Sequence, residues 1–338
     1  MDKYKLLMGG DAFFNEDVDL SAFKADYFMF NMEFAYSDES CVLGKVPLVS
    51  LYDWKKLIPA QKIIVSLANN HLMDAGDEGF NSTIKYLTEN NIAFFGAGTI
   101  ENSFNNPHIE MIDGQKYAFL GYCTLGKYQS DINSVSFFEK ERVLSDLKKC
   151  SLIAVDKIIV NMHWGVEESP KETQEQRNIG RWLIDHGVDI VIGHHPHCTQ
   201  PYEIYKKRYI FYSLGNLYFS DFSVRAFRKT QDDIGIAYRK KQLSWNKKSI
   251  VVGMNNHKLS NVDVYKCDYT KKKLRTKKIK RNIESHYRIS KFIMYYRKMK
   301  SLIVSNTFVE GKVVDVHFFV NEMRMFLKSR RKGKDIEK

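Results

Sequence analysis

Three histidines lie within four residues in segment 191–201, whose sequence is VIGHHPHCTQP. His194, His195 and His197 follow the apolar run 187–192, which predicts a buried strand. Neutral imidazole is the commonest metal ligand in proteins. His195 and His197 are two residues apart, so in an extended segment they can point to the same side. A polar surface turn would explain an isolated pair, but matching side chains elsewhere in the chain favour a metal site.

Ligand-type side chains also follow other apolar runs, each predicted to be a strand. They are Asp11 after 5–8, Glu33 after 25–30, Asn70 and His71 after 62–68, and His163 after 157–162. Carboxyl ends of strands in α/β sheets meet at one edge, so we expect these side chains to converge. Carboxylates, an amide oxygen and imidazoles without thiolates suit manganese, iron, magnesium or zinc. Such an ion activates water and polarises phosphoryl or carbonyl oxygens, which points to hydrolysis or phosphoryl chemistry.

The elements that must position these residues alternate between strands and helices. Apolar periodicity predicts helices over residues 79–91, 138–149 and 173–186, and further strands over 92–95, 117–122 and 208–214. This alternation predicts an α/β layered domain. Segments 248–254 and 261–267 alternate in polarity and predict antiparallel strands that complete a sheet.

The charge of the chain is uneven. The 338 residues include 52 Lys and Arg against 40 Asp and Glu, a net charge of +12. Residues 221–338 hold 31 basic and 11 acidic residues, a net charge of +20, which leaves −8 for residues 1–220. The run 271–281 is strongly basic, and helices are predicted over 283–299 and 313–327. We expect domains at 1–268 and 269–338, with a linker within 268–281.

The cysteine content and the distribution of apolar residues bear on the cellular location of the protein. The five cysteines are odd in number and contain no Cys-x-x-Cys pair, which argues against a disulfide framework and a thiolate zinc site. No apolar stretch of about 18 residues and no charged-then-apolar leader is present, so a cytoplasmic location is expected.

Seven motifs in order carry a resemblance to a known family. They are Gly10-Asp11, Asn31-Met-Glu33, Ala68-Asn-Asn-His-Leu-Met-Asp-Ala-Gly76, Gly96-Ala-Gly98, His163-Trp-Gly-Val-Glu167, Gly193-His-His-Pro-His197 with Gln200-Pro201, and Ser213-Leu-Gly-Asn216. Over about residues 4–220 the chain resembles the CapA-type capsule synthesis proteins, or poly-γ-glutamate biosynthesis family, of the calcineurin-like metallophosphoesterase superfamily. The resemblance implies an α/β fold, a four-layered αββα metallophosphoesterase-like sandwich, here followed by a basic, mainly helical C-terminal extension.

The resemblance also implies a site with one or two divalent ions, manganese, iron or zinc. Asp11 and His197 would hold one ion, Asn70, His163 and His195 the other, and Glu33 would bridge them. His71 would be the acid or oxyanion stabiliser that faces the substrate, and Asp74 its orienting partner. One departure stands out, because two-metal phosphoesterases usually begin with Asp-x-His, whereas Asp11 is followed by Ala12-Phe13. A one-metal enzyme and a vestigial site therefore both stay open.

Several neighbouring residues have a structural reading beside the functional one. Asn31, Glu167 and Asn216 could cap turns, and Trp164 is expected to pack at the rim of the site. His194 is expected to be a solvent-facing neighbour of the ligands.

We expect a metal-dependent hydrolase acting on a phosphoester or on the amide of a glutamate-like polymer, in synthesis of a bacterial surface polymer. The alternative is a non-catalytic accessory subunit that binds polymer or assists a membrane synthesis complex. The basic C-terminal region could be a solvated face, or it could attract an anionic polymer or an anionic membrane surface. Its motifs do not suggest nucleic acid as a partner.

Overall fold

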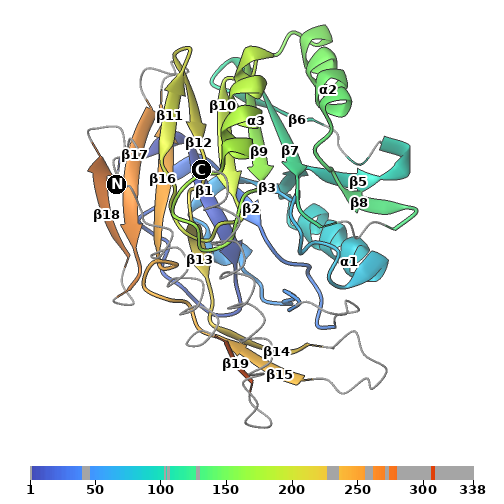
Figure 1. The fold of residues 1–338 in the computed structure, drawn as a ribbon, viewed down its shortest axis with the longest axis vertical. Coiled ribbons are helices and arrows are strands. Elements are labelled where there is room, and N and C mark those ends of the chain that lie inside the picture. Colours follow the sequence, from blue (N-terminus) through green and yellow to red (C-terminus); the bar gives the residue numbers. More distant parts are fainter. Residues whose placement is uncertain are drawn as a thin grey trace, which may run out of the picture.

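The computed structural model describes residues 2–39, 46–102, 104, 107–126, 130–226, 236–255, 262–270, 274–279 and 306–308. Within these ranges the chain is a mixed α/β structure with two large sheets and a few helices (Figure 1). The α/β class expected from the alternating periodicity is therefore confirmed. No helix in the described part is both long and apolar enough to cross a membrane.

The first sheet has the strand order β18-β17-β16-β1-β2-β3-β4. Its parallel half comprises β1 (Tyr4–Phe13), β2 (Ala25–Met32), β3 (Ala60–Ser66) and β4 (Ala93–Phe95). Its antiparallel half comprises β16 (Lys248–Met254), β17 (Val262–Asp268) and β18 (Arg275–Ile279). The expectation that the late alternating segments complete a sheet is confirmed. β13 (Asn216–Phe219) also pairs with β1, in parallel.

The second sheet has the order β11-β12-β10-β9-β7-β6. Its strands are β6 (His108–Ile112), β7 (Gln115–Cys123), β9 (Lys157–His163), β10 (Ile190–His194), β11 (Tyr202–Tyr205) and β12 (Arg208–Phe211). The strands β7, β9, β10 and β12 run parallel to one another. Two small sheets complete the described part: β14 (Phe222–Ala226) with β15 (Ile236–Lys240) and β19 (Asn306–Phe308), and β5 (Ala97–Thr99) with β8 (Asn133–Val135). Short 3₁₀ helices span Lys55–Leu57 and Ile100–Asn102.

The two large sheets pack against each other through alternating side chains. In β1, Leu6 and Met8 join a core that also contains Ile159 of β9 and Ile192 of β10. Leu7 points the other way, into a different core. This is the period-two pattern of strands that are buried on both faces.

Helices cover the outer faces of both sheets (Figure 1). α1 (Gly76–Glu89) packs Phe80 and Leu87 onto the outer core of the first sheet. α2 (Lys140–Leu152) and α3 (Gln174–Asp185) pack against the second sheet, with Val143 and Leu183 in its outer core. Each of the three helices overlaps the range predicted from the sequence.

α3 begins where the sequence supplies a capping box. Thr173 accepts a hydrogen bond from the N–H of Gln176, and the Gln176 side chain accepts one from the N–H of Thr173. This reciprocal pair satisfies donors that a helix N-terminus otherwise leaves free.

The predicted C-terminal helices 283–299 and 313–327 lie outside the described residues. Within the expected extension, Arg275–Ile279 forms β18 and pairs with β17 in the first sheet. The domain boundary at 268 stays a prediction.

A crossing segment from Tyr212 to Asn216 links the second sheet to the first. It passes so close to Gly10 and Gly193 that both of these positions require glycine. Gly215 accepts a hydrogen bond from the N–H of Asp11 at 3.0 Å, and the N–H of Leu214 donates to Gly193 at 3.1 Å. A Cβ on Gly10 would lie 1.8 Å from the carbonyl oxygen of Gly215, and one on Gly193 would lie 1.9 Å from that of Tyr212. Only glycine fits where these backbones approach, immediately before Asp11 and His194.

Candidate metal centre

The carboxyl ends of four strands bring the candidate ligands together. In the first sheet Asp11 of β1 lies opposite Asn31 of β2, and Glu33 follows β2 directly. In the second sheet His163 of β9 lies opposite His194 of β10. The side chains predicted to converge from separate strand ends therefore do meet, at the junction of the two sheets.

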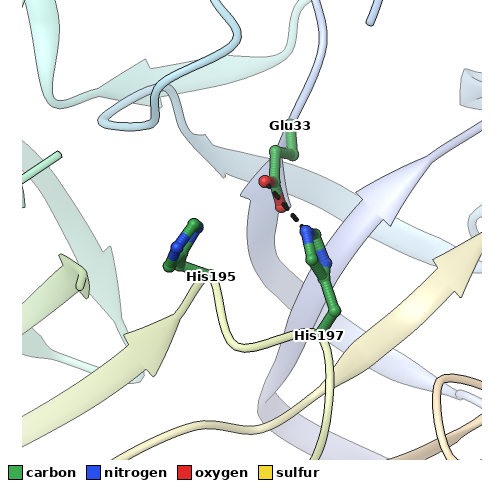
Figure 2. A group of neighbouring side chains, drawn as sticks. All are labelled: Glu33, His195 and His197. Atoms are coloured by element: carbon green, nitrogen blue, oxygen red, sulfur yellow. Dashed lines mark ion pairs between the residues drawn. The ribbon is translucent and has the colours of Figure 1, made fainter. Parts of the chain in front are cut away.

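Glu33 lies at the middle of this group. Its side chain is fully buried, and neither carboxylate oxygen has a hydrogen-bond partner among the residues that the structure describes. Its Oε1 is 3.5 Å from Nε2 of His197 and 3.7 Å from Nε2 of His163. Figure 2 shows His195 and His197 on one loop, with the Glu33 carboxylate facing His197 from another segment. A buried carboxylate without hydrogen bonds is costly to ionise, so this position favours either a neighbouring cation or a protonated acid.

Two sets of three ligand-type side chains share Glu33. One set is Glu33, His195 and His197, and the other is Asp11, Glu33 and His163; within each set the ligand atoms lie within 4.8 Å of one another. The family resemblance groups Asp11 with His197 and His163 with His195, and these residues are also close: Nδ1 of His197 is 3.8 Å from Oδ2 of Asp11, and the ring centroids of His163 and His195 are 4.9 Å apart. Glu33 is common to both sets, as a bridging ligand would be.

Asp11 is held by neighbours on both carboxylate oxygens. The Asn31 amide donates to Oδ1 at 2.9 Å, and the N–H of His195 donates to Oδ2 at 3.0 Å. Nδ1 of His194 is 3.0 Å from Oδ1. Burial alone would raise the pKa of Asp11, but the contacts with His194, His197 and Asn31 lower it below its usual range.

The expectation that His194 faces solvent is wrong. His194 is buried against Asp11. The apolar run predicts a strand that ends at Ile192, whereas β10 continues to His194. Alternation then points His194 to the same side as Ile192, into the space between the sheets.

His195 and His197 both adopt left-handed backbone conformations, with φ of 94° and 53°. Nδ1 of His197 is 3.0 Å from the Asn216 amide oxygen, so Nδ1–H donates and Nε2 is left to face Glu33. The sequence allowed two roles for Asn216, a turn cap or a functional residue. In the structure its side chain orients the imidazole of His197. Nδ1 of His195 is buried with no hydrogen-bond partner within the described ranges.

Asn70, His71 and Asp74 lie on the turn between β3 and α1. The Asn70 amide oxygen is 2.7 Å from Nε2 of His163, so these two atoms approach one point beside Glu33. Nδ1 of His71 is 2.7 Å from Oδ2 of Asp74, and the N–H of Leu48 donates to the same oxygen. The expected pairing of His71 with Asp74 is therefore present as a contact, while the catalytic roles stay predictions.

Asn69 holds this turn in place through its side-chain amide. It is not among the site residues predicted from the sequence. Its amide oxygen accepts hydrogen bonds from the N–H groups of His71 and Leu72, both at 3.0 Å. Its amide nitrogen donates to Met32 at 2.7 Å and to Asn31 at 3.2 Å. The two adjacent asparagines in Ala68-Asn-Asn-His are the sequence feature that could have indicated this role.

Other residues weighed from the sequence have clear positions. Trp164 is a buried packing residue, as expected, and its indole N–H donates to Tyr212 at 2.9 Å. Glu167 is exposed on the turn that follows β9. Glu168 and Asn246 are buried at the backbone of the loop that carries His197, and the sequence had not singled out either of them.

The pKa of Glu33 and those of two imidazoles in the site are shifted in opposite directions. Burial, together with the charges of Asp11 and Glu167, raises the pKa of Glu33 well above its usual range. Burial and the neighbouring histidines lower the pKa of His163 well below its usual range. Burial also lowers the pKa of His195 to about 4. The imidazoles of His163 and His195 are thus neutral near pH 7, the form in which they bind metals.

These residues fit a divalent cation. The site offers neutral imidazoles, an amide oxygen and a buried carboxylate without hydrogen bonds in the described part of the chain, a donor set that suits manganese, iron or zinc. A cation beside Glu33 would offset the cost of ionising it in a buried place.

Comparison with known proteins points to one family. The family model described as "Bacterial capsule synthesis protein PGA_cap" matches residues 7–221. The "Capsule biosynthesis protein CapA" of Bacillus anthracis is 31% identical over 182 residues, which are 52% of this chain and 43% of that protein. The "PGA biosynthesis protein CapA" of Bacillus subtilis (strain 168) is 29% identical over 194 residues, 53% of this chain and 47% of that one.

One more distant relative and one solved structure also match this chain. A "Probable polyglutamine synthesis accessory protein" of Mycobacterium tuberculosis (strain ATCC 25618 / H37Rv) is 25% identical over 172 residues, 46% of this chain and 44% of that protein. A hypothetical protein from Thermus thermophilus superposes with a TM-score of 0.40 at 10% identity, over 81% of this chain and 98% of that one, which is too distant to bear on function. The matched region spans less than half the length of each curated relative described here.

Proposed function

Because this chain belongs to the bacterial capsule synthesis protein PGA_cap family, we propose that it is a metal-dependent hydrolase in the biosynthesis of a capsule or similar surface polymer. The proposed fold is the αββα sandwich of calcineurin-like metallophosphoesterases. The proposed bond is a phosphoester or the amide of a polymer such as poly-γ-glutamate. We place the protein in the cytoplasm, beside a membrane synthesis complex or an anionic membrane surface.

The observation that carries this proposal is the environment of Glu33. It is a fully buried carboxylate without hydrogen bonds in the described part of the chain, and it is shared by both sets of ligand-type side chains. A structural carboxylate at such a depth would be expected to have donors around it. Glu33 instead lies beside His163 and shares a ligand set with His195, two imidazoles whose pKa values are lowered, and this arrangement suits a bound cation.

The residues that would hold one or two ions are Asp11, Glu33, Asn70, His163, His195 and His197. When bound, a divalent ion supplies a Lewis acid for the scissile phosphoryl or carbonyl group and activates water as the nucleophile. His71 would protonate the leaving group, because it is the imidazole of the site that is held by a carboxylate and partly open to solvent. Asp74 would fix its ring and tautomer through Nδ1.

A non-catalytic subunit is the second candidate, and Phe13 favours it. Phe13 occupies the position at which two-metal phosphoesterases usually carry the first histidine. It is buried and packs on Phe34, Phe219 and Phe222. This side of the site therefore provides a phenyl ring in place of a ligand, and a pocket that binds polymer without hydrolysing it would need no complete metal set.

The test is metal content by elemental analysis, paired with hydrolysis of an aryl phosphate ester and of a γ-linked glutamate oligomer in added manganese, iron or zinc. We expect one or two metal ions per chain and turnover of one substrate. His195→Ala should abolish both, while the exposed histidine variant His186→Ala should match the wild type. Metal binding without turnover would move the assignment to the accessory subunit. Absence of metal from the folded wild type would contradict the proposed centre.

A further inference from the structure

Three separate segments meet at the backbone of the loop that carries His197. They are the turn after β9 with Glu168, the loop that carries Pro196 and His197, and the turn before β16 with Trp245 and Asn246. Glu168 and Asn246 are separated by 78 positions in the sequence. Both side chains are buried, Glu168 with 5% and Asn246 with 3% of its surface exposed.

The contacts among these segments hold two consecutive carbonyl groups of the ligand loop. The Asn246 amide nitrogen donates to the carbonyl of His197 at 3.0 Å. The N–H of Glu168 donates to the carbonyl of Pro196 at 2.9 Å. The Glu168 carboxylate in turn accepts from the Asn246 amide nitrogen, at 3.0 Å to Oε1 and 3.3 Å to Oε2, and from the Trp245 indole N–H.

The ligand loop needs such support because its backbone is strained. His195 and His197 have φ of 94° and 53°, in the left-handed region that favours glycine. This conformation is unfavourable for a residue that carries a side chain, and it persists only where surrounding contacts determine it. Pro196 stiffens the loop, but it cannot by itself direct the two imidazoles towards Glu33.

We propose that Glu168 and Asn246 are positioning residues of the metal centre, which set the aim of His197 and His195 by holding the carbonyl groups of His197 and Pro196. This inference rests on the proposed metal centre. The hydrogen bonds described above end on the loop backbone and on the two residues themselves, so their effect passes through that backbone. A carboxylate suits this place because each oxygen accepts from a neighbour, the indole N–H on one side and the amide N–H on the other.

The test compares Asn246→Leu with the wild type by titrating each metal-free protein with Mn²⁺ or Zn²⁺ in a calorimeter. Leucine keeps the approximate volume and removes the donors. We expect metal affinity to fall 10- to 100-fold, the effect usual for loss of a group that orients a ligand. Glu168→Gln should give a smaller fall, because its amide N–H would face a donor. If Asn246→Leu does not fold, Glu168→Gln alone decides, and unchanged affinity in that variant would overturn the proposal.

The matched control is Tyr122→Phe. It removes a buried hydrogen bond to a carboxylate, from the Tyr122 hydroxyl to Asp146 at 3.0 Å, on the helix-covered face of the second sheet. It should lower the melting temperature without changing metal affinity. The double variant Glu168→Met with Asn246→Leu removes both partners of the Glu168–Asn246 hydrogen bonds, although the His197 carbonyl and the Trp245 indole N–H also lose these contacts. It should therefore recover part of the stability lost in Asn246→Leu while affinity stays low.

The outcomes separate the two levels of inference. If the wild type binds metal and Asn246→Leu binds it equally well, the positioning role is wrong while the metal centre stands. If affinity recovers together with stability in the double variant, the effect was one of stability alone and the positioning role is also wrong. If the folded wild type binds no metal, the metal centre fails, and the positioning role fails with it.

Discussion

At the scale of single residues, the site separates side chains that can hold a cation from side chains that can move a proton. Glu33 and the three facing imidazoles of His163, His195 and His197 are buried at the junction of the sheets. His71 lies at the edge, with 12% of its side chain exposed, and it is held by Asp74. The two groups should therefore respond differently to substitution.

His71→Gln should lower kcat roughly 10²- to 10⁴-fold while the metal content stays that of the wild type, because it removes only the proton donor. Steady-state kinetics on the substrate that the wild type hydrolyses, with elemental analysis of the same preparation, measures both quantities. Asp74→Asn should have the smaller effect, since Asp74 acts on the orientation of the ring. A loss of metal in His71→Gln would instead make this residue a ligand.

The metal-free protein should lose stability as the pH falls from about 6.5 to about 4. The unfolded state protonates His195 near its ordinary pKa of 6.5, whereas burial lowers the pKa in the folded state to about 4, so between these values the unfolded state binds more protons. The loss from this residue is roughly 3 kcal/mol. Glu33 opposes it, because its raised pKa makes the folded state less stable as the pH rises above the ordinary value of 4.5.

Urea denaturation of the chelator-treated protein at a series of pH values measures this dependence. In His195→Gln the component between pH 6.5 and 4 should be reduced by about 3 kcal/mol. His186→Gln, at an exposed position, should retain the wild-type profile. Identical profiles in all three proteins would show that burial of His195 has no effect on folding.

At the scale of elements, the site depends on how closely the crossing segment passes the strand ends. Gly10 and Gly193 each precede a residue of the site, and each lies against a carbonyl oxygen of that segment. The same approach lets Asn216, at the start of β13, reach His197. The glycines in Gly10-Asp11 and Gly193-His194 are therefore needed for packing of the backbone rather than for chemistry.

Gly10→Ala should destabilise the protein by roughly 3 kcal/mol or more, because its Cβ would lie 1.8 Å from a backbone oxygen that cannot move alone. Thermal or urea unfolding measures the change. Gly114→Ala is the control, since its Cβ would meet nothing within 4 Å and only the left-handed φ of 80° opposes it. That strain should cost about 1 kcal/mol. Equal losses in the two variants would contradict the steric argument.

At the scale of the whole molecule, charge and fold are distributed differently along the chain. Residues 1–220 supply the candidate ligands and carry −8, while residues 221–338 carry +20. The later part still contributes to the first sheet, because β16, β17 and β18 complete it. A test of the basic region should therefore replace charges and leave the strands in place.

Replacing Lys271, Lys272 and Lys273 with glutamine should weaken binding to poly-γ-glutamate roughly tenfold at low ionic strength, because attraction to a polyanion scales with the basic charge near it. The difference should disappear as salt is added. Replacing Lys55, Lys56 and Lys85, which are exposed elsewhere, makes the same change in net charge and should have little effect. Fluorescence anisotropy with labelled polymer measures the binding. Equal weakening by both triple variants would show that only net charge matters.

The local elements and most of the candidate ligands can be predicted from the amino-acid sequence alone. Periodicity of apolar residues predicted a helix at 79–91 where α1 spans Gly76–Glu89, and polar side chains after apolar runs indicated Glu33 and His163. These signals are local, because side-chain direction in a strand or helix repeats over a few residues. The order of the motifs added the family, which the match over residues 7–221 confirms.

Contacts between residues that are far apart in the sequence are seen only in the folded structure. His194 contacts Asp11, and Asn216 contacts His197. Asn246 donates a hydrogen bond to Glu168, which lies 78 positions away in the sequence. Glu33 also belongs to both sets of three candidate ligands. Such contacts depend on how two sheets pack and where a crossing segment runs, and neither leaves a periodic trace in the sequence because the partners belong to segments that are far apart along the chain.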